Sequence, residues 1–296
     1  MTPPRLRPPR RTPRAIVYRR RLAAVVVLAA GFAIAWFAVS GIGGGSGKRP
    51  TTTIALPPRP FKIVFPEGFT RAQMAQRVSA VSRIAQRERG RVPALRAHRY
   101  LAATAGVRVE PGFGSRRLPL EGFLFPATYD FTVRTTSPQL VGEQLVAFKR
   151  NWAKVNLRYA RSKNLTPYDV LTIASMIERE TAAPEERPLV AAVIYNRLHR
   201  RMPLGIDATL RYGLHIPPTE SIRQSQLAST SPYNTGKRPG LPPTPIANPG
   251  LASLQAAAHP AHVDYVYYVR KPDKTHHFFT ASFAEFEQYK AEHGYR

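Results

Sequence analysis

The sequence has no cysteine among its 296 residues, and it is poor in acidic side chains. The absence of thiols excludes disulfide bonds, cysteine-ligated zinc and a cysteine nucleophile. Asp and Glu number 18 against 44 Lys and Arg, so the formal net charge is +26. Such an excess indicates a polyanionic neighbour, which could be nucleic acid, an anionic membrane surface or an anionic cell wall. Charge alone does not choose among them.

The N-terminal residues 1–21 contain no acid at all, and they carry eight arginines. Subtracting those charges leaves 26 − 8 = +18 for the remainder of the chain. Because the segment is also rich in proline and has little apolar surface to bury, we expect a disordered basic tail.

Residues 22–40 (LAAVVVLAAGFAIAWFAVS) form an uncharged apolar run of 19 residues. A helix of that length roughly spans a hydrocarbon core of about 30 Å, and Trp36 suits the interface. A buried core helix is the alternative, but the basic flank on one side and the glycine-rich flank on the other favour a transmembrane helix. No A-x-A cleavage signal follows where a signal peptide would need one.

The basic flank places the N-terminus in the cytoplasm by the positive-inside rule, so everything after Ser40 is predicted to lie outside the cytoplasmic membrane. An extracytoplasmic domain does not meet chromosomal DNA or cytoplasmic RNA, so an envelope partner is favoured over nucleic acid. Residues 41–60 (GIGGGSGKRPTTTIALPPRP) read as a linker, flexible where glycine dominates and stiffer where proline does.

Folded sequence is expected to begin at Phe61, with an α+β class in which helices dominate and strands are few and short. Thr70 and Thr166 are placed to cap helices, and Pro167 fits a first helical position. The predicted elements are a strand at 61–65, helices at 70–86 and 93–104, an irregular aromatic stretch at 118–131, helices at 138–163, 166–181 and 185–201, a short helix at 250–258, strands at 265–270 and 277–281, and a C-terminal helix from 282.

The helix at 166–181 (TPYDVLTIASMIERET) carries the candidate chemistry. On a helical wheel Glu178 falls beside Leu171 and Ala174, and Glu180 falls between Ile173 and Met176. A carboxyl group held against apolar surface has a raised pKa, so it can stay protonated near neutral pH and donate its proton. The wheel alone does not choose between the two acids, and either could instead be a helix residue paired with arginine.

Four ordered blocks of the sequence resemble the YceG-like family of endolytic murein transglycosylases. These blocks are LEGFLFPATYDF (120–131), ASMIERET (174–181), EERPLVAAVIYNRLHRRMPLGIDATLRYGL (185–214) and SPYNTGKRPGLPPTPIANPGLASLQAAAHP (231–260). The likeness extends over roughly residues 61–290. It departs from the family pattern at Gly205 and Gly236, and it has one FPEG element (65–68) where many members have two such elements.

The resemblance implies an enzyme, a lyase that cleaves the β-1,4 bond between N-acetylmuramic acid and N-acetylglucosamine in nascent glycan strands. The muramyl 6-hydroxyl attacks its own anomeric carbon, so the product ends in 1,6-anhydro-N-acetylmuramic acid and glycan elongation stops. One carboxyl group serves as acid and then as base, whereas ordinary glycosidases use two. By position in the motif the catalytic residue is Glu178, with Glu180 in support.

The other matched blocks are expected to line the sugar groove. The predicted substrate-binding residues are Glu121, Tyr129, Asn196, Asp207, Thr209, Tyr233, Asn234 and Thr235. By the same resemblance, residues 61–117 form a LysM-like α+β subdomain, shortened relative to the family, and residues 118–296 form the catalytic domain. The expected partners are peptidoglycan, the cytoplasmic membrane and the peptidoglycan synthesis machinery, with no nucleic acid.

Other kinds of site fit the sequence less well. His259, His262, His276 and His277 lack an ordered carboxylate partner and a metal-ligand spacing, and Ser175 sits in no nucleophile elbow. We therefore expect no metal and no cofactor. Two rival functions remain: a non-catalytic, membrane-anchored wall-binding scaffold that keeps the fold, and a nucleic-acid-binding membrane protein.

Overall fold

The computed structural model describes residues 60–90, 92–108, 112–113 and 117–295, which all belong to one folded unit beginning at residue 58. The predicted tail (1–21), membrane helix (22–40) and nearly all of the linker (41–60) lie outside the described residues. Within those described residues, no helix combines the length and the apolar character needed to cross a bilayer.

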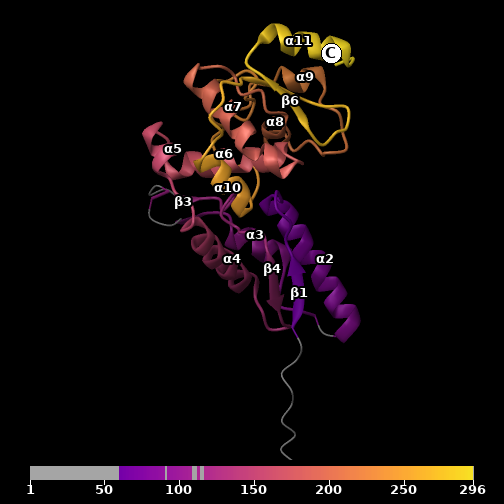
Figure 1. The fold of residues 1–296 in the computed structure, drawn as a ribbon. Helices are drawn as coiled ribbons and strands as arrows, with labels where there is room; N and C mark the ends of the chain where they lie inside the picture. The colour runs from indigo at the N-terminus through magenta and orange to yellow at the C-terminus, as the bar shows by residue number, and fades with distance from the viewer. Residues whose placement is uncertain (1–59, 91, 109–111, 114–116, 296) are drawn as a thin grey trace, which may run out of the picture. The chain divides into compact units, whose positions relative to one another are not determined.

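The first half of the unit packs three helices around a two-stranded sheet (Figure 1). Strands β1 and β4 run antiparallel, with Phe61 opposite Phe131 and Ile63 opposite Tyr129. The alternating side chains of both strands bury one face against the helices. The elements are β1 (Phe61–Val64), α2 (Arg71–Arg89), α3 (Ala97–Ala103), β2 (Val107–Arg108), β3 (Arg117–Leu118), β4 (Thr128–Phe131) and α4 (Ser137–Trp152).

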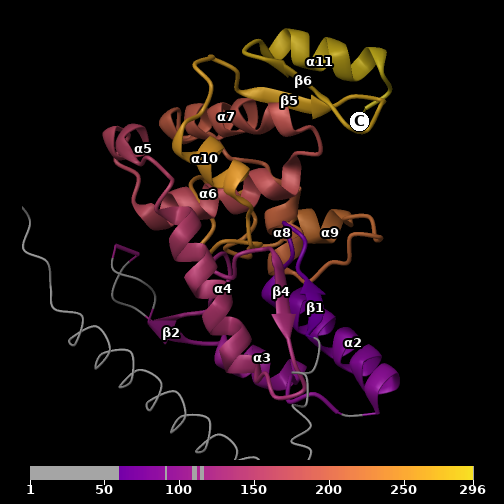
Figure 2. The same cartoon turned by 60° about the horizontal axis from the view of Figure 1, so that its bottom comes forward.

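The second half is built around helix α6, which α7, α8 and α10 contact (Figures 1 and 2). Thr166 caps α6 as predicted: its hydroxyl accepts the Asp169 N–H, and the Asp169 carboxylate accepts the Thr166 N–H. All residues from Val170 to Ile177 are buried, so α6 is the core of this half. The elements are α5 (Arg158–Ser162), α6 (Pro167–Glu180), η1 (Pro184–Glu186), α7 (Arg187–His199), α8 (Asp207–Gly213), α9 (Gln224–Leu227), α10 (Leu251–Ala258), β5 (Tyr267–Arg270), β6 (His277–Thr280) and α11 (Phe283–Glu292).

This architecture confirms the expected helix-rich α+β class with a few short strands. Two expectations about elements were wrong. The helix predicted at 138–163 is two helices, because the chain turns after Trp152 and the Asn156 side chain accepts the Arg158 N–H where α5 begins. The stretch predicted as irregular at 118–131 contains β4, which is ordered by pairing with β1.

Candidate active site

Glu178 lies in the last turn of α6 and points into a polar niche. The Gly250 N–H donates to its Oε2 at 2.9 Å, and Arg187 Nη2 lies 3.7 Å from its Oε1. The side chain of Glu178 is 6% exposed and that of Arg187 is 13% exposed. The surroundings of Glu178 are therefore buried, as the wheel predicted, but they offer a hydrogen-bond donor and a cation as well as apolar neighbours.

A third group in this niche, Glu67, was missed by the sequence analysis. It lies in the turn after β1, which is joined to the segment before α10 by two backbone hydrogen bonds, Gly68 N–H to Asn248 O and Asn248 N–H to Phe69 O, both 2.9 Å. The Glu67 carboxylate lies so close over Gly250 that a Cβ at that glycine would meet its Oε1 at 1.8 Å.

The charge of Glu178 acts on the Glu67 carboxyl group. Partial burial raises the pKa of the Glu67 carboxyl, the negative charge of Glu178 raises it further, and the Arg187 guanidinium opposes the rise. The signal in the sequence was the acid of the FPEG turn, but only the fold brings it against Gly250. Two carboxylates and one guanidinium in a sheltered niche are a group able to hold and transfer a proton.

Glu180, two residues further along α6, belongs to a different set of contacts. Its Oε2 accepts the Tyr268 hydroxyl at 3.2 Å. Burial raises the pKa of the Glu180 carboxyl, and the charge of Asp207 adds to that rise, whereas the Tyr268 hydrogen bond and the nearby His277 and Arg270 lower it. The structure thus brings two predicted site residues, Glu180 and Asp207, near each other at the start of α8, apart from the Glu178 niche.

Glu121 is the most fully bonded of the predicted substrate-binding acids. Its Oε1 accepts the Arg71 N–H at 2.9 Å and the Asn248 amide at 2.8 Å, and its Oε2 accepts the Tyr212 hydroxyl at 3.1 Å. Burial raises the pKa of Glu121 to about 7 against the lowering effect of these bonds. Glu121 lines a cavity of about 690 Å³, which Tyr233 from the predicted set and Arg179 also line.

The polar groups of four other predicted residues make hydrogen bonds within the protein, between α8 and the segment after α9 or within that segment. The hydroxyls of Thr209 and Thr235 lie 2.9 Å apart, and both residues are buried. The Asn234 amide donates to the backbone oxygens of Leu227 and Ser229, and the Tyr233 hydroxyl lies 2.8 Å from the Thr244 hydroxyl. A direct sugar contact from these side chains stays a prediction, and Tyr233 is the one that also lines the cavity.

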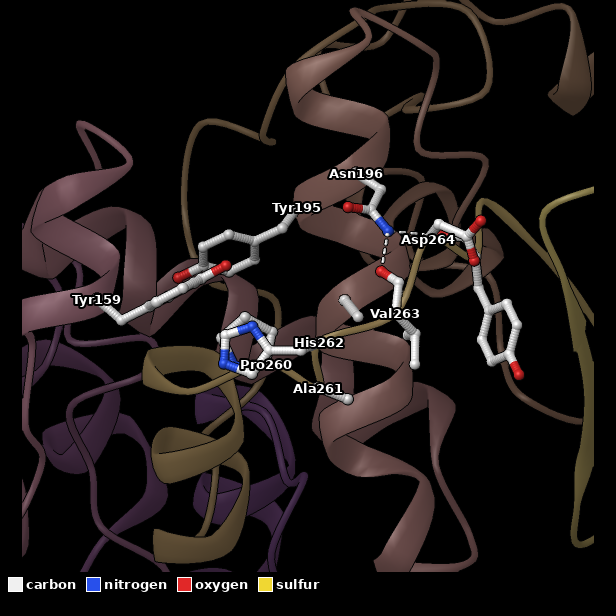
Figure 3. A pocket seen from close by; sticks show the side chains of 10 residues that line it. Tyr159, Tyr195, Asn196, Pro260, Ala261, His262, Val263 and Asp264 are labelled. Carbon is white, nitrogen blue, oxygen red and sulfur yellow. Dashed lines mark hydrogen bonds between the residues drawn. The ribbon is translucent and has the colours of Figure 1, made fainter.

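The remaining two predicted residues lie elsewhere. Tyr129 is 8% exposed in β4 and donates its hydroxyl to Phe125 O at 2.7 Å. Asn196 lies on α7 beside a separate hollow of about 590 Å³, where its amide donates to Val263 O and Tyr265 O at 2.9 and 2.8 Å (Figure 3). That hollow shares no lining residue with the Glu121 cavity, so the structure does not bring Asn196 to the same groove as Glu121.

Two of the four histidines considered for metal binding have ordered carboxylate partners, so the expectation that they lack such partners was wrong. His277 lies with its Nδ1 2.6 Å from Glu186 Oε2, and His276 Nδ1 lies 3.0 Å from Asp273 Oδ2. In the part of the chain that the structure describes, no three His, Asp or Glu side chains gather where they could hold a metal ion.

Comparison with known proteins places this arrangement in a family. Residues 46–292 match the sequence profile of the YceG-like family. Two relatives are named endolytic murein transglycosylase. The relative from Bacillus subtilis is 38% identical over 155 residues, which cover 52% of this chain and 42% of the relative. The relative from Streptococcus pneumoniae R6 is 36% identical over 184 residues, which cover 60% of this chain and 33% of the relative. The chain therefore matches less than half the length of these relatives.

A crystal structure of a yceG-like protein from Listeria monocytogenes shares the fold with a TM-score of 0.64 and 30% identity, over 78% of this chain and 76% of that one. A family profile that spans nearly all of the described residues and a solved structure matched over most of both chains agree with each other. The chain belongs to the YceG-like family.

Proposed function

We propose that this protein is an endolytic murein transglycosylase that cleaves the β-1,4 bond between N-acetylmuramic acid and N-acetylglucosamine in nascent glycan strands. The proposal is supported by the names of the relatives from Bacillus subtilis and Streptococcus pneumoniae, and by the four sequence blocks described above. Its product would be a 1,6-anhydro-N-acetylmuramic acid end, which cannot be elongated further.

The observation that carries the proposal is the sheltered Glu178 carboxyl group, which the Gly250 N–H and Arg187 hold in place. In the first step protonated Glu178 gives its proton to the glycosidic oxygen while the bond to the muramyl anomeric carbon breaks. In the second step the Glu178 carboxylate takes the proton of the muramyl 6-hydroxyl, whose oxygen bonds to that anomeric carbon. Glu178 regains its proton, no water is consumed, and the nucleophile is already in place.

The neighbouring acids would assist from two sides. Glu180, held by the Tyr268 hydroxyl, and the nearby Asp207 offer hydrogen bonds on one side of the end of α6. The cavity that Glu121 and Tyr233 line has a volume of about 690 Å³, which falls within the range of ordinary small-ligand pockets. Arg179, which follows Glu178 directly, also lines this cavity, so we place part of the glycan there.

The proposal includes an anchor in the cytoplasmic membrane through residues 22–40, with the N-terminus in the cytoplasm and the catalytic domain outside, close to the peptidoglycan synthesis machinery. Residues 61–117 would be a shortened LysM-like wall-binding subdomain. The basis is the charge-free apolar run with its basic flank, together with the resemblance. A reporter fused after Arg296 should be active outside the membrane, and a cytoplasmic reporter would favour the nucleic-acid-binding alternative.

The decisive experiment compares the wild-type protein, purified as the full chain in detergent, with Glu178→Gln. Glutamine keeps the shape but cannot exchange the proton, so we expect release of anhydro-ended fragments from glycan strands to fall by at least about 100-fold. Mass analysis of the released glycan ends measures the product. The matched control is Glu88→Gln, at an exposed acid on α2, which should leave the rate unchanged. Equal inertness of wild type and Glu178→Gln would favour the non-catalytic scaffold.

A further inference from the structure

The reaction proposed above assigns no role to the Glu67 side chain. Glu67 and Glu178 nevertheless both lie against the same residue, Gly250. Gly250 presents its N–H to Glu178 Oε2, while its Cα face lies directly beneath Glu67 Oε1. A side chain at this position would take the place of the Glu67 carboxylate, so the glycine is what allows that carboxylate to lie there. The backbone φ of −77° at Gly250 is ordinary for any residue, so this close approach, and not the backbone conformation, is what favours glycine.

The turn that carries Glu67 is joined to the rest of the protein through its backbone. The backbone of Gly68 and Phe69 makes the two hydrogen bonds to Asn248, and the Gly68 carbonyl accepts Arg179 Nη1 at 3.3 Å. An acid placed against a second acid is repelled by it. The repulsion between Glu67 and Glu178 does not help to form the turn, so the position of Glu67 points to a role in the niche.

The charges around the niche come from four elements. The turn after β1 supplies Glu67, α6 supplies Glu178 and Arg179, α7 supplies Arg187, and the start of α10 supplies the Gly250 N–H with the partial positive charge of a helix N-terminus. Arg187 is itself fixed, because its Nε donates to the Ser253 hydroxyl at 3.1 Å. The positive charge of Arg187 can balance one of the two carboxylates. The two carboxyl groups and Arg187 together are therefore neutral when one of the carboxyl groups is protonated.

We propose that Glu67 is a positioning residue for Glu178: its carboxylate lies against Gly250 and near Arg187, the two groups that contact Glu178, and so helps to hold the Gly250 N–H and the guanidinium where the proposed reaction needs them. This inference rests on the proposed function of Glu178. It adds that the acid step depends on a residue from the turn after β1, outside the predicted catalytic domain. Such a pair titrates in two steps that belong to the pair and not to either acid.

The first test needs no enzymatic activity. In the full chain carrying ¹³C-labelled glutamate, carboxyl resonances are followed by NMR against pH in wild type and in Glu178→Gln. Because the charge of Glu178 raises the pKa of Glu67, the Glu67 titration midpoint should fall in the variant. The internal control is Glu143 on α4, whose pKa is raised by partial burial and by Asp130 and not by Glu178, so its midpoint should stay the same in the variant. An unmoved Glu67 midpoint would overturn the pairing.

The second test is the pH profile of glycan cleavage in Glu67→Gln. Glu67→Gln removes a charge that the wild type carries only where Glu67 is ionised, so the loss of activity should be greatest on the alkaline side of the profile. We expect a loss in kcat of about 10-fold at pH 8 and less than about 2-fold at pH 5, with KM and the unfolding midpoint unchanged. Gly250→Ala, which keeps Glu67 but displaces its carboxylate, should reproduce this profile, and Glu88→Gln should keep that of the wild type.

Two outcomes of this test would contradict the proposal. A Glu67→Gln profile that overlays the wild-type profile would show that Glu67 does not position the groups that contact Glu178. A Glu67→Gln protein as inert as Glu178→Gln at every pH would make Glu67 the proton donor itself. If the wild type releases no anhydro ends, the proposed function fails, and the NMR titration still decides whether the two acids form a pair.

Discussion

At the scale of single residues, the buried carboxyl group of Glu121 predicts a pH dependence of the protein's stability. The carboxyl group is 3% exposed, and burial raises its pKa to about 7 from its ordinary 4.5. The unfolded chain therefore releases this proton at a lower pH than the folded protein does. The stability that the protonated form provides is complete below pH 4.5 and is lost as the pH rises to about 7.

The Glu121 prediction concerns thermal stability. The wild type should lose stability between pH 5 and pH 8, with about 3 kcal/mol as an upper bound for the part that Glu121 contributes. Glu121→Gln, which cannot ionise, should show a smaller drop in unfolding midpoint over that interval, measured by circular dichroism. Glu88→Gln should keep the full drop. An equal drop in Glu121→Gln and wild type would assign the pH dependence to other groups.

At this scale the sequence predicted the candidate acids better than their surroundings. The helical wheel placed both Glu178 and Glu180 toward the interior, and both do make buried or part-buried contacts. It could not tell them apart, because the difference lies in Gly250, Arg187 and Tyr268, which other segments supply. Glu67 could not be found in this way, since its significance depends on a glycine 250 − 67 = 183 positions away.

At the scale of elements, Asn248 joins three segments through its side chain. Its Oδ1 accepts the N–H groups of Gly122 and Leu124 at 2.9 Å each, and its Nδ2 donates to Phe69 O and to Glu121 Oε1. The residue is fully buried, so water cannot replace these bonds. The turn before α2, the turn before β4 and the loop before α10 are held together by one amide.

The Asn248 prediction is a large loss of stability. Asn248→Ala leaves the buried N–H groups of Gly122 and Leu124 without their acceptor and should lower the free energy of unfolding by roughly 3 kcal/mol, measured by urea denaturation. The matched control is Asn156→Ala, which removes one exposed bond to the Arg158 N–H and should cost at most about 1 kcal/mol. Similar losses in the two variants would mean that the three segments are held together without this amide.

The helices were more predictable than the strands, for a physical reason. The caps at Thr70 and Thr166 were predicted because they depend on residues three positions away. Strand β4 was missed because its order comes from pairing with β1, which lies more than sixty positions earlier in the chain. The break after Trp152 was missed because residues 143–163 contain neither glycine nor proline, the residues that usually mark the end of a helix.

At the scale of the whole molecule, the prediction concerns attachment to the membrane. If residues 22–40 span the bilayer, the full chain should stay in the membrane fraction in high salt and leave it only with detergent. Deleting residues 2–40 should move the protein to the soluble fraction, as followed by immunoblot. Deleting residues 2–15 alone removes five of the eight arginines and should leave it in the membrane. If the chain that lacks residues 2–40 still stays in the membrane fraction in high salt, residues 22–40 are not the anchor.

The two hydrogen bonds that tie Gly68 and Phe69 to Asn248 have a consequence for timing. They connect positions 248 − 68 = 180 apart, and Glu178 gains its backbone donor only when that connection brings Gly250 into place. Contacts between such distant positions form late in folding, after the intervening chain has been synthesised. If the protein is exported and acts as we propose, a polypeptide still emerging from the membrane would not yet have an assembled site, and glycan cleavage would begin only when export is nearly complete.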